Sequence, residues 1–530
     1  MGTIYGRANR ILICLGPDAG HGKHVASLVA DINQLIGSQL EEFGSWDRLP
    51  LLDPKDSLAK DRRWNSLSAL FQCPWFTRVW VVQEVALATE ACVLYGPAEI
   101  VWRDLLKVHV WLETKARFVW REFRLLLNDI HQPECWSFQF FSPLARQITF
   151  VEILGRAKKF GCSDARDRVY AFLGLSLAQV GPEDRLIIEP DYENNYLEGY
   201  REFALQWLKH TRNLCLLSTV EHTAETFESD LPSWVPRWDC SVVYEHIGLY
   251  SQRFLTFNWT SQAAINFISN TGLRVRGVIF DSVHFQSEIL TGELPRAIIA
   301  LRYLLEPTKN VFFALFGRYL PELTQNVLFT LWPNLLGPTN DVFVAPRMDV
   351  LDSLWRYLSK PTTKCAYNDG KRLLAFSRTL CAKTFCLDGS TLSADKALFE
   401  NEVSFADEAS FGLWLCRKSS CFNGVNEAAL EEDARGGDIA AFLMYAMSWY
   451  FNRRFILTDN GYYGLAPQIT KQGDVCCIIY GVGIPFILRK TEKEHHYKLV
   501  GASFNLGMME GQVLKNMERW GLKEQDIILY

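Results

Sequence analysis

The stretch that most constrains this chain runs from Pro74 to Ala88 and reads Pro-Trp-Phe-Thr-Arg-Val-Trp-Val-Val-Gln-Glu-Val-Ala-Leu-Ala. A proline can occupy the first turn of a helix, where its missing N–H costs no hydrogen bond. Eleven of the fifteen residues, counting the proline, are apolar. Because a helix that is apolar nearly all round is buried, the sequence predicts a buried helix that begins at Pro74.

This predicted helix carries one carboxylate, Glu84, which lies four residues after Trp80 and therefore shares a face with its indole. A carboxylate that is carried into a core must find a partner, shift its pKa or line a cavity. Two further polar residues, Arg78 and Gln83, lie close to it in sequence. Glu84 is therefore a candidate functional residue, and the alternative is a structural carboxylate that pairs with Arg78 or another buried base.

Several motifs give the chain a family resemblance. Residues Trp75–Val85, with their order of Trp, Arg, Trp and Gln-Glu, resemble the signature that ends the fungal heterokaryon incompatibility (HET) domain. The box Asp164–Leu175, Asp-Ala-Arg-Asp-Arg-Val-Tyr-Ala-Phe-Leu-Gly-Leu, resembles a second element of this family. The turn Pro190–Tyr192 and the Trp- and Pro-rich segment Leu231–Asp239 are also similar to family elements. The resemblance therefore extends well beyond one motif.

The start of the chain departs from the family pattern. In HET proteins a helix, an Arg and an apolar strand ending in Leu-Gly follow two or three earlier strands, whereas here the matching segment is already Ile4–Gly16. Cys14 also stands where the family usually has Trp. The resemblance thus implies that the first strands of the HET domain are missing, either through a truncated gene model or in a degenerate member. A parallel sheet without those strands would expose edges and apolar faces.

We expect an α+β protein with four regions. Residues 1–100 would form the C-terminal part of the HET domain, an α/β unit whose parallel sheet the resemblance relates to Toll/interleukin-1 receptor (TIR) and flavodoxin-like folds. Residues 101–265 would be helical and carry the family motifs, and residues 266–450 would be mixed, mainly helical and interrupted by an insertion. In residues 451–530 short apolar runs alternate with Asn-Gly and similar turns, which predicts a β-rich, barrel-like domain.

Local patterns predict individual elements within these regions. Short apolar runs predict strands, and apolar residues at three- and four-residue steps predict helices. Good capping residues at both ends add a helix over Ser163–Gly174. The predicted strands lie at residues 10–16, 91–96 and 273–281, and the other predicted helices at 25–43, 62–71, 102–127, 196–208 and 289–337.

Composition excludes several classes of protein. The formal net charge is −5 and no basic patch stands out, which argues against a nucleic-acid partner. Fourteen cysteines are scattered along the chain and are expected to be reduced in a cytoplasmic protein. The pairs Cys381/Cys386 and Cys416/Cys421 have a wider gap than structural zinc sites usually show, so we expect no metal. The apolar region 296–338 is broken by charges, so we expect no membrane span.

The resemblance implies a function in allorecognition. A HET protein would be a heterokaryon incompatibility factor that promotes programmed cell death, through self-association or through another incompatibility protein. The alternatives are a non-catalytic signalling or interaction module and an inactive truncated member of the family. No cofactor would be required in any of these cases.

The resemblance also raises an enzymatic hypothesis, because some TIR domains cleave NAD with a glutamate. By that analogy NAD would be the substrate, Glu84 would stabilise the charge that develops as nicotinamide leaves, and Arg78 and Gln83 would position the ribose or the phosphates. Asp18 follows the first apolar strand and would lie at the carboxyl-end rim of a parallel sheet, where ligands bind. The alternative for Asp18 is an ordinary turn aspartate.

Overall fold

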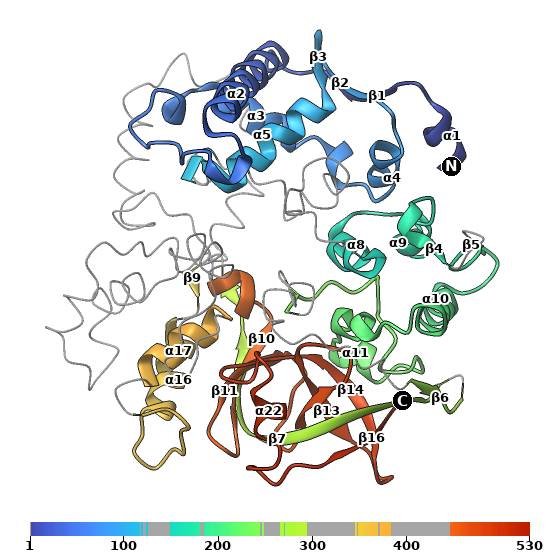
Figure 1. The fold of residues 1–530 in the computed structure, drawn as a ribbon, viewed down its shortest axis with the longest axis vertical. Coiled ribbons are helices and arrows are strands. Elements are labelled where there is room, and N and C mark those ends of the chain that lie inside the picture. The colour runs from blue at the N-terminus through green and yellow to red at the C-terminus, as the bar shows by residue number, and fades with distance from the viewer. Residues whose placement is uncertain are drawn as a thin grey trace, which may run out of the picture.

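The α+β class predicted from the sequence is confirmed. Figure 1 shows an N-terminal unit of helices and a small sheet, a middle layer of short helices and a C-terminal β structure, which follow one another along the longest axis of the molecule. The computed structural model describes residues 2–116, 118–119, 123, 125, 149–180, 185–243, 246–247, 265–269, 271–293, 345–346, 348–368, 372–382 and 446–530. The predicted insertion, Cys386 and the pair Cys416/Cys421 lie outside these residues.

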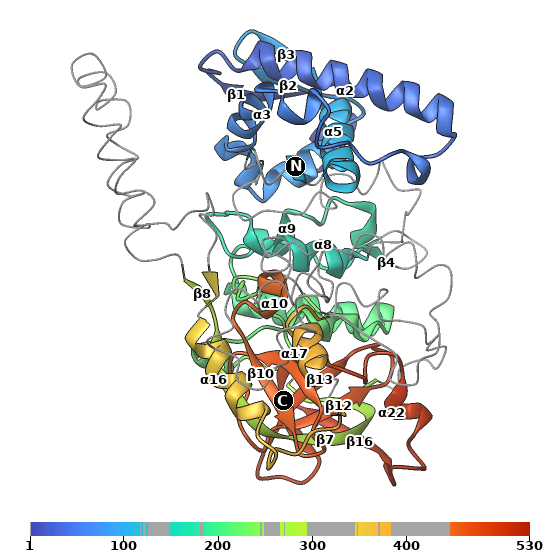
Figure 2. The same ribbon diagram turned by 90° about the vertical axis from the view of Figure 1, so that its left-hand side faces the viewer.

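The N-terminal unit is built on a small mixed sheet. Strand β1 (Ile11–Gly16) pairs in parallel with β2 (Ala91–Tyr95), which pairs antiparallel with β3 (Ala98–Val101). The long helix α2 (Gly22–Phe43) contacts α3, α5 and β3, as Figure 2 shows. The predicted strands of this unit and the helices predicted over 25–43 and 62–71 are confirmed, and the helix predicted over 102–127 is confirmed only for Trp102–Lys115, because Ala116 is not helical. The likeness to TIR and flavodoxin folds stays a prediction. The remaining elements of the unit are α1 (Gly2–Arg7), η1 (Trp46–Arg48), η2 (Leu58–Lys60), α3 (Arg63–Phe71) and α5 (Trp102–Lys115).

The single helix predicted from Pro74 is wrong. The segment forms a short 3-10 helix, η3 (Pro74–Thr77), and a separate α-helix, α4 (Trp80–Ala86). Between them the backbone is extended and pairs with a remote segment: the Gly161 N–H donates to the Thr77 carbonyl at 2.6 Å, and the Val79 N–H donates to the Gly161 carbonyl at 3.0 Å. These bonds use backbone groups that a continuous helix would need.

The middle layer consists mainly of short helices. The helix predicted over Ser163–Gly174 is only one turn, α9 (Asp167–Tyr170), because Asp164 binds the Arg166 N–H and guanidinium instead of capping a longer helix. The helix predicted over 196–208 is confirmed as α10 (Tyr196–Thr211), with Asn195 as its N-cap. The layer also contains α8 (Phe150–Arg156), η4 (Ala157–Lys159), η5 (Ser176–Ala178), β4 (Gln179–Val180), β5 (Arg185–Leu186), η6 (Leu214–Thr219) and α11 (Ala224–Phe227).

The C-terminal β-rich region is confirmed, and it closes on itself. Strand β7 (Leu273–Leu290) pairs with both β16 and β12, and β13 and β14 complete the ring between them. The far half of β7 pairs with β10, so the sheet continues through β11 to β15. The strands that pair with or follow β7 are β6 (Asn266–Phe267), β10 (Arg453–Thr458), β11 (Tyr463–Pro467), β12 (Val475–Ile479), β13 (Pro485–Lys490), β14 (His496–Ala502), β15 (Phe504–Asn505) and β16 (Glu524–Leu529).

Strand β7 belongs to this sheet although it lies in the region expected to be mainly helical. The predicted strand at 273–281 is therefore confirmed and extends further, and the helical prediction is wrong for residues 289 and 290, which still belong to β7. Residues 294–337 lie outside the described part of the chain. The other elements here are β8 (Gly292–Glu293), β9 (Ala345–Pro346), α16 (Met348–Leu358), α17 (Arg372–Leu380) and α22 (Gln512–Lys515).

Buried tryptophans mark the core. Trp64, Trp111, Trp234 and Trp238 are all fully buried. The Trp234 Nε1–H donates to the Thr271 carbonyl, and this bond links the segment Leu231–Asp239 of the middle layer to the start of β7. No helix of the described residues has the length and apolar character needed to cross a membrane.

Candidate functional site

Glu84 lies on α4 and faces the N-terminal helix α1. The side chain is partly exposed rather than buried, and it accepts a hydrogen bond from the hydroxyl of Tyr5 on α1. Burial raises the pKa of Tyr5 and the Glu84 carboxylate raises it further, while the positive charge of Arg78 acts in the opposite direction. Within the described part of the chain Glu84 and Arg78 form no ion pair, so the predicted pairing of these two residues is wrong.

Gln83 does not share this position. It is almost fully buried, at 2% exposure, whereas its neighbour Glu84 is partly exposed. Consecutive residues of a helix point in different directions, so one side chain enters the core and the other faces α1. Of the three candidates in this segment, Glu84 and Arg78 each act on the Tyr5 hydroxyl without pairing with each other, and Gln83 lies in the core.

Asp18 lies at the carboxyl end of β1, as predicted, and its carboxylate folds back on the following loop. It accepts hydrogen bonds from the N–H groups of Gly20 at 3.2 Å and Gly22 at 2.7 Å, and these bonds lower its pKa. A Cβ on Gly96 would lie 2.3 Å from the Asp18 Cγ, so the carboxylate packs directly against that glycine. Asp18 thus has the contacts of a turn aspartate and already occupies N–H groups at the start of α2, where an anion would bind.

The direction of the strands separates Asp18 from Glu84. Helix α4 leads into the amino end of β2, where the Glu90 carbonyl accepts from the Ile11 N–H at the amino end of β1. Asp18 follows the opposite, carboxyl end of β1, a strand of six residues or about 20 Å at ~3.3 Å per residue. The candidate residues therefore do not form one site.

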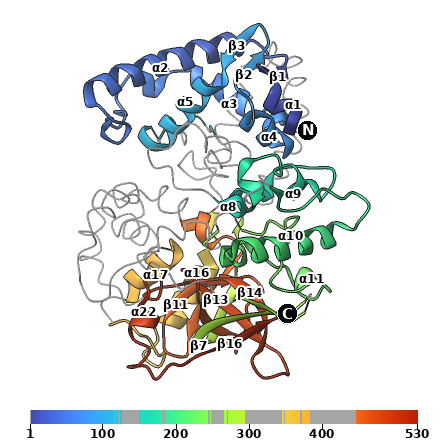
Figure 3. The same ribbon diagram turned by 45° about the vertical axis from the view of Figure 1, so that its right-hand side comes forward.

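The structure connects the two family motifs through one aspartate that the sequence had not singled out. The Trp80 Nε1–H on α4 donates to Asp167 Oδ2 on α9 at 3.0 Å. The other oxygen of the same carboxylate, Oδ1, accepts from the Tyr192 hydroxyl at 2.7 Å. Figure 3 shows α8, α9 and α10 between α4 and the barrel, so Asp167 lies where the N-terminal unit meets the middle layer.

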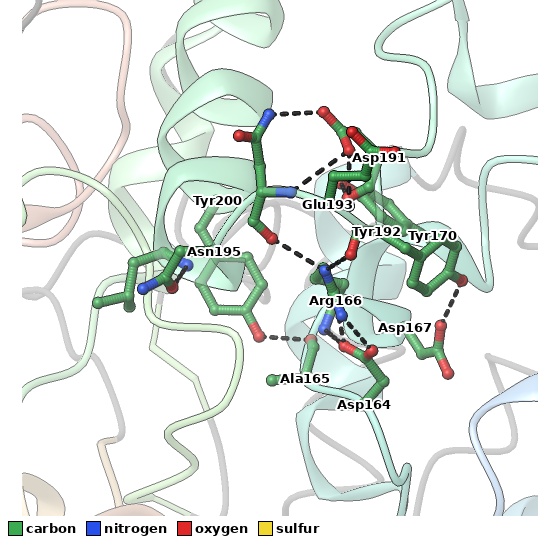
Figure 4. Close-up of polar contacts among 12 residues, drawn as sticks. Asp164, Ala165, Arg166, Asp167, Tyr170, Asp191, Tyr192, Glu193, Asn195 and Tyr200 are labelled. Atoms are coloured by element: carbon green, nitrogen blue, oxygen red, sulfur yellow. Dashed lines mark hydrogen bonds and ion pairs between the residues drawn. The ribbon is translucent and has the colours of Figure 1, made fainter.

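Arg166 organises the rest of this cluster. Its guanidinium binds the Asp164 carboxylate through two hydrogen bonds of 2.9 and 2.7 Å and lowers the pKa of that group. It also donates to the carbonyls of Tyr192 and Asn194 and lies over the Tyr192 ring, 5.0 Å from the centroid. Figure 4 shows how these contacts hold the turn at residues 191–194 against α9.

Two tyrosine hydroxyls complete the cluster. The Tyr170 hydroxyl donates to the Asp191 carbonyl at 3.1 Å, and the Tyr200 hydroxyl donates to the Ala165 carbonyl at 2.6 Å. Its charged groups therefore all have protein partners, and its visible role is to fix one local conformation. The alternation of Asp and Arg in the box was the sequence signal for this cluster.

A second polar cluster lies buried between the middle layer and the barrel. The Lys158 ammonium donates to Glu221 Oε1 at 3.1 Å and to the Thr219 carbonyl at 2.7 Å. His246 Nε2 lies 3.1 Å from the same Glu221 oxygen, and the N–H groups of Val242 and Val243 donate to the other one. Glu221, His246, Val242 and Val243 border a cavity of about 30 Å³, enough for one water molecule.

Burial and charge act in opposite directions on this cluster. Burial is the largest effect and disfavours the charged form of Glu221, but the Lys158 ammonium, His246 and the hydrogen bond from the Val242 N–H together outweigh it, so the pKa of the carboxyl is lowered to about 2. Burial lowers the pKa of His246 to about 3, so this imidazole is neutral at pH 7. Among the described residues, no three His, Cys, Asp or Glu side chains gather as a metal site.

Comparison with known proteins agrees with these motifs. Residues 1–84 match the family model of the heterokaryon incompatibility protein (HET), and residues 417–522 match the Het-6 beta-barrel domain. These two matches support a fungal HET domain protein. It is similar to Heterokaryon incompatibility protein 6, OR allele, of Neurospora crassa, with 23% identity over 98% of this chain and 79% of that protein. No solved structure matches the chain.

Proposed function

We propose that this protein acts in heterokaryon incompatibility, as a cytoplasmic allorecognition factor that promotes programmed cell death. The HET match at residues 1–84 and the similarity to a heterokaryon incompatibility protein support this role. The observation that carries it is the hydrogen bond between Trp80 and Asp167, because it joins the HET signature to the second family motif. The signature is thus physically coupled to the layer that leads to the barrel.

The protein acts through contacts with a partner, as a non-catalytic signalling module. Glu84 accepts from Tyr5, and the Asp18 carboxylate accepts from two backbone N–H groups, so both have protein partners. The two carboxylates lie at opposite ends of the parallel strands, which argues against a shared substrate. Self-association or binding of another incompatibility protein is the expected mode of action.

The role in cell death is tested by expressing the full chain in a fungal host and counting dead cells with a vital dye. Trp80→Phe removes the indole N–H and keeps a ring, so we expect it to lower the death rate tenfold or more. Trp520→Phe is the matched control, because Trp520 is 37% exposed on the surface of the barrel region. A wild type that causes no death, or a Trp80→Phe variant as potent as the wild type, contradicts the proposal.

Measuring NAD in the same cells separates signalling from catalysis. We expect Glu84→Gln to leave both cell death and the NAD level as in the wild type, because Gln keeps the shape and can accept from Tyr5. Glu90→Gln, at an exposed position just after α4, is the control. If NAD falls in the wild type and recovers only in Glu84→Gln, the protein is a glutamate-dependent NADase.

A further inference from the structure

Phe227, at the end of α11, packs into the barrel rather than into its own layer. It is only 4% exposed and joins a second hydrophobic cluster, whose other members among the described residues lie between Val278 and Leu522. Its neighbours in the middle layer, such as Trp234 and Trp238, belong to the main cluster instead. Figures 1 and 3 show α11 beside β14. The barrel therefore takes up one aromatic side chain from a segment outside its own strands.

Two basic residues of the barrel lie over the ring of Phe227. Arg489 on β13 and Lys498 on β14 are directly opposite each other in the antiparallel pair, so their side chains share one face of the sheet. The Arg489 Cζ lies 4.8 Å from the centroid of the ring, and the Lys498 Nζ lies 5.1 Å from it. Like charges directly opposite each other on neighbouring strands repel, whereas an aromatic ring attracts both. This pair of cations therefore favours an aromatic group at this position.

The two cations differ in the partners that balance their charge. Arg489 donates two hydrogen bonds of 2.8 Å to the Asp474 carboxylate, which belongs to the barrel itself. Lys498 instead contacts the segment of α11, where its ammonium donates to the Phe227 carbonyl and to the Glu228 carboxylate, each at 3.3 Å. The Glu228 side chain is 71% exposed, so this ion pair contributes little stability and is easily exchanged. The barrel thus offers an ammonium group to an acidic residue that follows an aromatic one.

Phe227 lies near the middle of a short loop whose ends are tied together. His222 Nε2 donates to the Ser233 carbonyl at 2.9 Å, and this bond closes the loop 222–233 at its base. The base is also fixed to the barrel, because the Leu499 N–H donates to Ser233 Oγ at 2.8 Å. Helix α11 has only four residues, too few for a helix that is stable without packing. The tip of the loop can therefore leave the barrel while its base stays in place.

We propose that this face of the barrel recognises an aromatic residue followed by an acidic one, and that Phe227 and Glu228 of the chain itself occupy the site until a partner presents the same pair. The partner is a segment of another protein that carries Phe-Glu or a similar dipeptide. This inference rests on the proposed function, in which the protein acts by binding a partner, and it names the chemistry of that partner. Its tests measure peptide binding in solution and no cell death, so they can fail while the proposed function holds.

The loop competes with any partner for this site. Because its tether is short, Phe227 has an effective concentration on the order of millimolar at the barrel. A free peptide of ordinary affinity therefore binds the wild type weakly, and removing the ring from the loop relieves the competition.

Fluorescence anisotropy of a labelled synthetic peptide with the sequence of residues 221–230 tests the site on the purified full chain. We expect the Phe227→Ala protein to bind it at least tenfold more tightly than the wild type does, because its site is empty. Adding Lys498→Gln should weaken this binding fivefold or more, whereas Lys490→Gln, at an exposed position on β13, is the matched control and should leave it unchanged. Equal affinity of the wild type and the Phe227→Ala protein, or equal binding of a peptide that itself carries Phe227→Ala, overturns the proposal.

Hydrogen exchange in the wild type tests the site even if Phe227→Ala does not fold. The Phe227 N–H donates to the Thr223 carbonyl, so we expect it to exchange at least fivefold faster when millimolar peptide displaces the loop. The amides of β12 should keep their rates, and the peptide that carries Phe227→Ala should change nothing. An unchanged rate at Phe227 with millimolar peptide overturns the proposal. Wild-type dimers that the peptide dissociates would place the loop of a second copy in the site and overturn the choice of partner.

Discussion

The two sheets of this molecule differ in whether their strands form a closed ring. In the C-terminal barrel, β7 has neighbours on both sides, and the ring through β12, β13, β14 and β16 closes on itself. In the N-terminal sheet, β1 pairs with β2 and with no other strand of the described residues, and Leu12 and Val101 are exposed on the outer face. Closure removes free edges and favours stability, whereas an open edge leaves backbone groups available for recognition. The comparison predicts that the closed barrel contributes more to the stability of the molecule than the small sheet does.

Equivalent substitutions in the two sheets give the largest expected effects. Ile487 on β13 is fully buried and Ile13 on β1 is 1% exposed, so Ile→Ala removes the same atoms from similar surroundings. We expect a loss of about 2–5 kcal/mol in the free energy of unfolding, at the upper end for Ile487, because a closed ring relaxes less around a cavity. Urea unfolding followed by circular dichroism measures both, and an equal or larger loss at Ile13 would break the comparison.

The buried cluster of Lys158, Glu221 and His246 forms the junction between the barrel and the middle layer, so the barrel can stabilise the molecule only if this junction stays intact. Glu221→Gln leaves the Lys158 ammonium buried without its counter-charge, so we expect a loss of about 3 kcal/mol at pH 7. Gln keeps the shape of the side chain, which makes the effect electrostatic. A melting temperature equal to that of Glu228→Gln, an exposed control on α11's end, would show that the junction tolerates the unpaired lysine.

The same junction predicts how stability depends on pH. His246 has a lowered pKa of about 3 in the folded protein and Glu221 a lowered pKa of about 2. The unfolded chain therefore binds more protons, and stability falls as the pH drops from 6.5 towards 3 for the histidine and from 4.5 towards 2 for the carboxyl. Melting temperatures measured from pH 7 to 4 should fall less steeply in His246→Gln than in the exposed control His495→Gln. Parallel curves would contradict this assignment.

A smaller effect is expected where the N-terminal unit meets the middle layer. Asp167→Asn weakens the acceptor for both Trp80 and Tyr192, and we expect a loss of about 1–2 kcal/mol. Hydrogen exchange should then speed up in the turn at residues 191–194 before it changes in the barrel. Uniform acceleration across both regions would mean that the two sheets unfold together.

The smallest effect belongs to the open sheet's outer face. Arg10 and Glu99 are both largely exposed, so Arg10→Ala should leave the urea midpoint of the monomer unchanged within error. Repeating the measurement at high salt provides the control, because an exposed pair is screened there. A clear shift of the midpoint at low salt would show that this exposed face contributes to stability.

Local periodicity predicted most of the helices and strands, because the spacing of apolar residues along the chain indicates which face of an element is buried. The failures came from contacts distant in sequence. Gly161 breaks the helix predicted from Pro74, and Asp167 lies 87 residues from Trp80. Strand β7 joins a sheet whose other strands come much later in the chain, so its place in the barrel had no local signal. Asp18 was correctly predicted to follow the carboxyl end of β1. Its separation from Glu84 could not be predicted, because it depends on the parallel pairing of β1 with β2.

The place of β7 in the barrel also has a consequence for how the protein is made. Its neighbours β10, β12 and β16 are synthesised long after it, and the Ser233 N–H finds its acceptor, the Tyr530 carbonyl, only when residue 530 is present. During synthesis on the ribosome, the backbone N–H and C=O groups on both edges of β7 therefore stay unpaired, while the small sheet at the N-terminus can already form. Barrel closure therefore has to wait for the synthesis of β16, and chaperones that shield unpaired strands have the longest opportunity to act on β7.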